Sequence, residues 1–224
     1  MILIFARLHA AAGKDVAAAT ANASALQTAE RALRLDLTAA ANRWLVEHPA
    51  LIQPAVLYYR LYYLVLLGTL IWVFVRRPGV YLTVRRTLIA MALLALPVFW
   101  ALPMSPPRFA LPGVVDIVAT YDLFGGDATR ELQTGANLYS AMPSMHVAWS
   151  LWCGYALWRA LRASPQRPAR LTAWLPWLFP LGMMAVVLAT GNHYVLDIAG
   201  SLALLAVSVA AAAAWSRLTA RADA

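Results

Sequence analysis

Five long apolar stretches, nearly free of charge, restrict this chain to one class of fold. A helix needs about 20 apolar residues to cross the hydrocarbon core of a bilayer, and each stretch is close to that length. Of the 224 residues 62% are hydrophobic and only 12% are charged, unlike an average soluble domain. We predict an all-α integral membrane bundle of about five transmembrane helices. The predicted spans cover approximately residues 55–75, 87–103, 143–159, 172–190 and 194–215.

The residues before these spans have a different pattern. Residues 16–46 are rich in alanine, and Leu26, Leu33, Leu37 and Trp44 recur at helical spacing among charged residues. This pattern predicts an amphipathic helix along the membrane surface, and a helix packed on the rest of the protein explains it equally well. We expect an N-terminal amphipathic or interfacial segment (1–54), a membrane-embedded domain (55–215) and a cytoplasmic tail (216–224).

Basic residues set the expected orientation of the bundle. The net charge is +8, and all 18 basic residues except Lys14 are arginines. The connections 76–86 and 159–170 contain arginines and no acid, so the positive-inside rule places both in the cytoplasm and leaves 104–142 and 191–193 outside. Since the arginines cluster between apolar spans, we expect membrane lipids and no nucleic acid as partners. The arginine- and alanine-rich composition suggests a bacterial plasma membrane.

Two short motifs each place a histidine at the mouth of an apolar helix. In residues 141–146 (AMPSMH), Pro143 fits the first turn of a helix, where free N–H groups attract an anion such as phosphate. In residues 191–197 (GNHYVLD), a helix that began there would bring His193 and Asp197 onto one face, within hydrogen-bonding reach. Both motifs fall on the predicted outer side, so we expect them to form a single site.

Asp197 is the only acid in any of the predicted spans. A charge at the centre of a bilayer costs about 2.5–3.5 kcal/mol, so its presence needs a reason. The simplest partner is His193: the carboxylate accepts from one ring nitrogen, fixes the tautomer and leaves the other nitrogen as a nucleophile. Such a pair alone is often only a satisfied helix-end contact. A second histidine on the same side, His146, favours the catalytic interpretation.

These motifs together resemble the phosphatidic acid phosphatase type 2 superfamily. More narrowly, the Pro-Ser-x-His and His-Tyr-x-x-Asp segments are similar to the inositolphosphorylceramide synthase-like branch. The resemblance covers roughly residues 55–215 and includes Pro106-Pro107-Arg108 ahead of the first histidine. Each motif alone is weak, whereas their order, spacing and topology are fairly specific.

The resemblance implies a mechanism through a phosphohistidine. His193 would attack the phosphorus of a phosphate ester, Asp197 would orient it, and His146 would protonate the leaving alkoxide and then activate the acceptor. Ser144 and nearby backbone N–H groups would hold the phosphate oxygens. Arginines and a helix N-terminus can neutralise the transition-state charge, so we expect neither a metal nor another cofactor.

Two cations of the usual superfamily pattern are missing. The phosphatases carry a Lys-x6-Arg-Pro segment, and the Arg77-Pro78 found here lies on the predicted cytoplasmic side. They also carry an arginine six residues before the nucleophile, where this chain has Val187. We expect Arg108 to replace one of these cations, since Pro106 and Pro107 restrict the backbone before it. The further candidates for phosphate binding are Arg130, Arg60 and Asn192, the last of which is equally suited to a helix cap.

The sequence therefore predicts a lipid phosphatase that hydrolyses a phosphate monoester or pyrophosphate. The alternative is a phosphotransferase, in which inositol or another alcohol accepts the phospho-group, because both reactions share the first step. A transporter without catalysis predicts ionisable residues near the bilayer midplane, whereas here they cluster at the outer helix ends. His9 and His48 have no partner in the sequence, and we expect them to face solvent or the interface. The oligomeric state is left open.

Overall fold

The structure is a computed structural model that describes residues 2–12, 15–121, 137–163 and 172–222. Within these ranges the chain is helical, and the one extended contact is an isolated bridge between Met104 and Ser140. The all-α expectation is therefore confirmed. The apolar bundle contains α5 (Tyr62–Arg76), α6 (Pro78–Ala101), α10 (Met145–Arg162), the 3-10 helix η1 (Thr172–Trp177) that leads into α11 (Leu178–Ala189), and α12 (Val195–Ala222).

Helix α10 is the centre of the bundle and packs against α5, α6, α11 and α12. Trp152 is fully buried, and its indole N–H donates to the carbonyl of Val84 on α6 at 2.9 Å. Gly154 allows η1 to approach closely, because a Cβ at this position would lie 3.2 Å from the carbonyl oxygen of Pro176. Tight packing around α10 thus fixes the direction in which its first turn points.

The structure supports three or four candidate spans and not the five that we expected. In the described part of the chain, three segments are long and apolar enough to cross a bilayer: Pro78–Ala101, Thr172–Ala189 and Val195–Ala220. A fourth is possible if α4 (Pro49–Arg60) and α5, which meet at a bend of 43°, act as one span. Helix α10 does not qualify among them. Because other helices surround α10, it carries buried Trp149, Ser150 and Gly154 where a lipid-facing helix would carry leucine or valine.

The predicted helix over 16–46 is two helices, α2 (Val16–Ala32) and α3 (Thr38–Val46). The chain turns between them, with Arg34 at a φ of 57°. Of the apolar residues that suggested one amphipathic stripe, Leu26 is buried, while Leu33, Leu37 and Trp44 are exposed. The buried faces are instead lined by small and polar residues, and α2 contacts α7 and α12 while α3 contacts α11. The alternative of a packed segment therefore describes this region better than one helix lying on the membrane.

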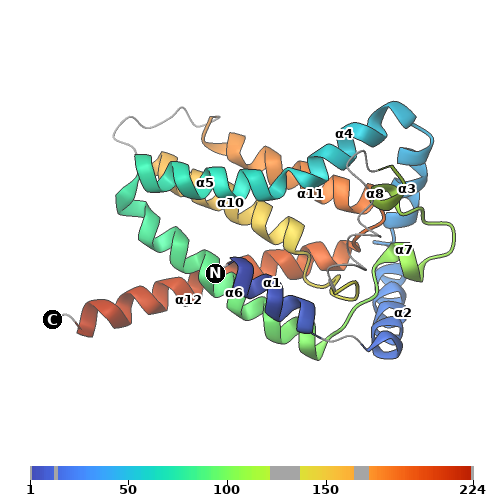
Figure 1. The fold of residues 1–224 in the computed structure, drawn as a ribbon, viewed down its shortest axis with the longest axis horizontal. Coiled ribbons are helices and arrows are strands. Elements are labelled where there is room, and N and C mark those ends of the chain that lie inside the picture. Colours follow the sequence, from blue (N-terminus) through green and yellow to red (C-terminus); the bar gives the residue numbers. More distant parts are fainter. Residues whose placement is uncertain (1, 13–14, 122–136, 164–171, 223–224) are drawn as a thin grey trace.

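Short helices complete the end of the molecule where α2 and α3 lie (Figure 1). They are α7 (Pro107–Ala110) and α8 (Ile117–Tyr121). The turn from α5 to α6 and the end of α12 lie at the opposite end of the bundle. There Arg86 donates to the Ser216 hydroxyl of α12 at 2.8 Å. Since α6 begins at Pro78, Arg85 and Arg86 belong to the helix and not to a connection.

Candidate active site

The two histidine motifs meet where α10 and α12 begin. Helix α12 starts at Val195, so His193 precedes it, and only Asp197 lies in the first turn. The expected contact nevertheless forms: His193 Nδ1 lies 3.2 Å from Asp197 Oδ2. The same carboxylate oxygen accepts the backbone N–H of Tyr194 at 2.9 Å. Asp197 therefore caps the start of its own helix and holds the imidazole in front of it.

The hydrogen bonds of His193 determine its tautomer. Nδ1 lies 3.0 Å from the carbonyl oxygen of Ala141, in addition to its contact with Asp197. Both neighbours are acceptors, so Nδ1 must carry the proton, and in the neutral ring Nε2 holds the lone pair. Asp197 is fully buried and His193 is 6% exposed. The site thus presents one oriented, nucleophilic nitrogen at an almost closed surface.

His146 is the second residue of α10, and its ring centroid lies 5.9 Å from that of His193. Two tyrosines of α4 and α5 enclose it: Tyr59 stacks on the ring at 4.1 Å, and Tyr62 contacts it edge-on at 4.3 Å. Neither tyrosine is among the site residues expected from the sequence. Their spacing of three residues, near the start of the predicted span 55–75, is the signal that could have placed them beside His146.

Ser144 is the N-cap of α10, which starts two residues later than Pro143 suggested. Its hydroxyl accepts the N–H of Val147 at 3.3 Å, and its carbonyl accepts the hydroxyl of Ser201 from α12 at 2.9 Å. Ser144 is fully buried. The bond from Ser201 joins the start of α10 to the second turn of α12, and so holds together the two helices that follow the motifs.

Arg108 lies on α7 and reaches the segment that carries His193. Its guanidinium donates to the side-chain oxygen of Asn192, and its Nε lies 3.1 Å from Asp116 Oδ2. Its backbone N–H donates to Gly191 at 2.9 Å. The amide nitrogen of Asn192 donates to the Thr190 hydroxyl at 2.9 Å, so the Asn192 side chain orients Arg108. Arg108, the first candidate for a phosphate-binding cation, therefore contacts Asn192, the residue directly before His193.

The two other candidate cations are Arg60 and Arg130. Arg60 is the last residue of α4 and follows Tyr59, which stacks on His146. Arg130 lies outside the described residues. Among the residues that are described, no group of three or more histidine, cysteine, aspartate or glutamate side chains could hold a metal ion.

Gly191 makes the tight turn before His193 possible. Its φ is +76°, and a Cβ there would lie 2.7 Å from Val114 Cγ1 and 3.1 Å from the carbonyl oxygen of Val115. Asn42 of α3 clamps the same region: its amide nitrogen donates to the carbonyl groups of Val115 and Ala189 at 3.0 and 2.9 Å. The turn thus depends both on glycine and on the N-terminal helices.

His9 was expected to face solvent or the interface, and the structure corrects this. It packs on Phe5 and against the edge of Phe99, and its Nε2 lies 2.7 Å from the Ser140 hydroxyl. That hydroxyl donates to the carbonyl of Asn137, so Nε2 of His9 is the donor. Burial lowers the pKa of His9. His9 therefore supports the loop before Ala141, whereas His48 stacks on Trp44 at an exposed position.

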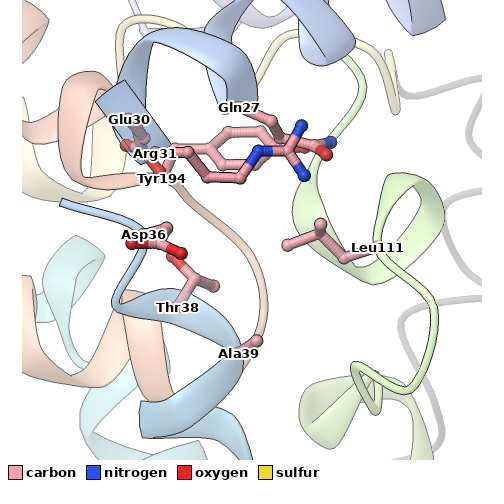
Figure 2. Close-up of a pocket in the computed structure, with 8 residues that line it drawn as sticks. All are labelled: Gln27, Glu30, Arg31, Asp36, Thr38, Ala39, Leu111 and Tyr194. Atoms are coloured by element: carbon pink, nitrogen blue, oxygen red, sulfur yellow. The ribbon is translucent and has the colours of Figure 1, made fainter. Parts of the chain in front are cut away.

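A small polar pocket lies on the other side of the His193 segment, between α2, α3 and the end of α7 (Figure 2). Its volume is about 90 Å³. Tyr194 forms one wall of the pocket, and most of the other lining side chains are charged or can form hydrogen bonds. The lining residues are Gln27, Glu30, Arg31, Asp36, Thr38, Ala39, Leu111 and Tyr194.

Comparison with known proteins places this chain in a family. No curated protein and no solved structure matches the chain. The sequence profile of the PAP2 superfamily matches residues 24–211, a range that contains both histidine motifs and also reaches back into α2 and α3. This match covers most of the sequence, and the chain therefore belongs to the PAP2 superfamily.

Proposed function

We propose that this protein is a membrane lipid phosphatase that hydrolyses a lipid phosphate monoester or pyrophosphate through a phosphohistidine on His193. The observation that carries the proposal is the pairing of His193 Nδ1 with two acceptors, Asp197 and Ala141, which leaves Nε2 as the nucleophile. His146 lies beside this nucleophile, with 5.9 Å between the two ring centroids.

In the first step, the lone pair of His193 Nε2 attacks phosphorus and forms a P–N bond. The P–O bond to the lipid breaks, and the leaving alkoxide takes a proton from protonated His146. Asp197 stabilises the positive charge that develops on the His193 ring, because its buried carboxylate faces Nδ1–H.

In the second step, neutral His146 removes a proton from water, and the resulting hydroxide attacks phosphorus. The P–N bond breaks, which releases phosphate and returns His193 to its starting tautomer. Arg108 and the first turn of α10 would stabilise the negative oxygens in both steps, with Ser144 fixing the position of that turn. In this proposal Arg130 and Asn192 assist as a second cation and as the holder of Arg108.

Location in a membrane suits a lipid substrate. The acyl or prenyl chains can stay among the apolar helices while the headgroup reaches the histidines. The arginines of the α5–α6 turn and of the end of α12 lie at the end of the bundle opposite to α7 and α8, which supports an extracytoplasmic site under the positive-inside rule. In a bacterial plasma membrane, phosphatidate, phosphatidylglycerol phosphate and polyprenyl phosphates are the substrates to test.

One observation favours a second function, phosphotransfer. The pocket beside Tyr194 combines carboxylate, guanidinium, amide and hydroxyl groups, which are suited to a small alcohol. If such an alcohol reached the phosphohistidine before water, the protein would be a transferase, as the likeness to the inositolphosphorylceramide synthase-like branch suggests. The outer connections expected from the sequence are too short to form a separate acceptor domain, which favours water as the acceptor.

The experiment that tests the function is phosphate release by detergent-purified protein. A panel of lipid phosphates is offered in the presence of a chelator, to wild type and to His193→Ala. We expect release that disappears in the variant. A labelled headgroup that moves only to added glycerol or inositol would support transfer instead, and flux of lipid through vesicles that survives His193→Ala would favour a transporter.

A further inference from the structure

The backbone that carries His193 and Asp197 is held from one side by polar residues of α2 and α3. Thr38 donates its hydroxyl to the carbonyl of His193 at 3.2 Å, and Gln27 donates to the Tyr194 hydroxyl at 3.2 Å. These contacts join residues more than 150 positions apart in sequence. The N-terminal helices are therefore built against the nucleophile segment itself.

Glu30 is the most unusual of these residues. It lies on the buried face of α2 with only 2% of its surface exposed, and its Oε1 accepts the backbone N–H of Leu196 at 2.7 Å. Leu196 is in the first turn of α12, where N–H groups have no partner within the helix. A carboxylate is favourable at this position, since the helix dipole is positive there. Yet a buried carboxylate is expensive, so the contact needs a reason beyond packing.

We propose that Glu30 is a positioning residue for catalysis: by capping the first turn of α12 it fixes the backbone from which Asp197 orients the nucleophile His193. This inference rests on the proposed function. Leu196 is the residue directly before Asp197 and lies three residues after His193. A displacement of the Leu196 backbone therefore moves the carboxylate that holds Nδ1. Shifts of this size near reacting atoms can lower rates strongly without abolishing binding.

The geometry divides the capping of this turn between two acids. Asp197 accepts the N–H of Tyr194, and Glu30 accepts the N–H of Leu196. Asp197 uses one oxygen, Oδ2, for both Tyr194 and His193, so the position of its backbone decides both contacts. Without Glu30, the N–H of Leu196 would lose its acceptor, and the first turn that carries Asp197 would be less firmly fixed. The result would be a His193 ring that is less firmly held in its productive tautomer.

The test compares three variants in the proteoliposome-reconstituted full-length protein with the lipid phosphate on which wild type is most active. Glu30→Ala removes the acceptor, and Glu30→Gln keeps an acceptor oxygen of the same reach. Glu47→Ala removes an exposed acid at the end of α3 and is the matched control. We expect Glu30→Ala to lower kcat roughly tenfold or more with KM within about twofold. Glu30→Gln should restore kcat to within about threefold of wild type, and Glu47→Ala should match wild type.

A second readout does not need activity. In protein labelled with 15N-histidine, the nitrogen shifts of His193, assigned by comparison with His193→Gln, report which ring nitrogen carries the proton. We expect the Nδ1–H tautomer in wild type and Glu30→Gln, and a mixture in Glu30→Ala. Full kcat in Glu30→Ala, or a loss of kcat that Glu30→Gln fails to restore, would overturn the positioning role. If wild type itself released no phosphate, the proposed function would fail, and the tautomer measurement would still decide the role of Glu30.

Discussion

His193 Nδ1 faces two oxygen acceptors at once, Asp197 Oδ2 at 3.2 Å and the Ala141 carbonyl at 3.0 Å. A carbonyl cannot donate, so the proton lies on Nδ1 while both contacts are made, and Asp197 and Ala141 share in holding it there. It also joins the two motifs, because Ala141 belongs to the segment that leads into His146. The nucleophile and the proposed acid are therefore positioned by one set of contacts.

Asp197→Asn should reduce turnover more than it alters the fold. The amide still accepts from Tyr194, but it lacks the charge that stabilises the imidazolium of His193 in the transition state. We expect kcat to fall on the order of 10²- to 10⁴-fold, which is measured as phosphate release at saturating lipid. Because the Ala141 carbonyl still accepts from Nδ1–H in part of the molecules, some activity should persist. Unchanged kcat would contradict the role given to Asp197.

Arg108→Ala should weaken stabilisation of the phosphate charge, and Arg108→Lys should recover only a part of it. A lysine keeps the charge but cannot contact Asn192 and Asp116 with one planar group. We expect kcat/KM to fall on the order of 10²-fold for alanine and less for lysine. Arg43→Ala, at an exposed position of α3, is the control. Equal loss in the lysine and alanine variants would mean that Arg108 acts through geometry and not through charge.

Gly191→Ala should damage the site through the backbone. An alanine at a φ of +76° is strained by roughly 1–2 kcal/mol, and its Cβ would collide with Val114. We expect a lower melting temperature together with a loss of activity. Gly68→Ala in α5 is the matched control, because nothing lies within 4 Å of its Cβ position and alanine favours a helix. Normal activity in Gly191→Ala would show that the turn is not required.

Burial raises the pKa of Glu30 above its ordinary value of 4.5, and Asp197 and Asp36 act in the same direction. The hydrogen bond from Leu196 opposes the shift, and Arg31 and Tyr194 also line the pocket beside Glu30. The folded state therefore binds the proton of Glu30 more tightly than the unfolded state. This contribution is fully present below the unfolded pKa and is lost as the pH rises through the raised folded pKa.

The consequence is a pH-dependent difference between wild type and Glu30→Gln. As the pH is raised from about 4 to about 7, the melting temperature of wild type relative to Glu30→Gln should fall, because only wild type must ionise the buried carboxyl of Glu30, while Asp197 is common to both proteins. Circular dichroism melts of the two proteins in matched detergent measure this. A difference that stays constant or grows with pH would contradict a raised pKa for Glu30.

Much of this architecture could be predicted from the sequence, because apolar length and helical spacing are local signals. The pairing of His193 with Asp197 and the meeting of the two motifs followed from spacing and from the distribution of arginines. The central role of α10 could not be predicted, since a helix surrounded by protein needs no lipid-facing surface. The tryptophans, serine and glycine of α10 lower the mean hydropathy of the helix, and the sequence does not indicate which helices pack against them.

The contribution of the N-terminal helices was the main omission. Glu30 and Thr38 act on residues more than 150 positions away, and nothing in the local pattern of α2 or α3 indicates those partners. The apolar residues Leu33, Leu37 and Trp44, which suggested a buried stripe, are exposed in the structure. His9 was missed for the same reason, since its partner Ser140 lies far along the chain.

The central claim is a covalent phosphate on Nε2 of His193, and trapping that intermediate tests it most directly. Wild type is mixed with a lipid phosphate labelled with 32P and quenched with alkali within milliseconds to seconds, and the labelled peptide is identified by mass spectrometry. The account predicts an alkali-stable, acid-labile label on His193 that is absent from His193→Gln. Turnover with no label on His193, or with the label on His146, would contradict it.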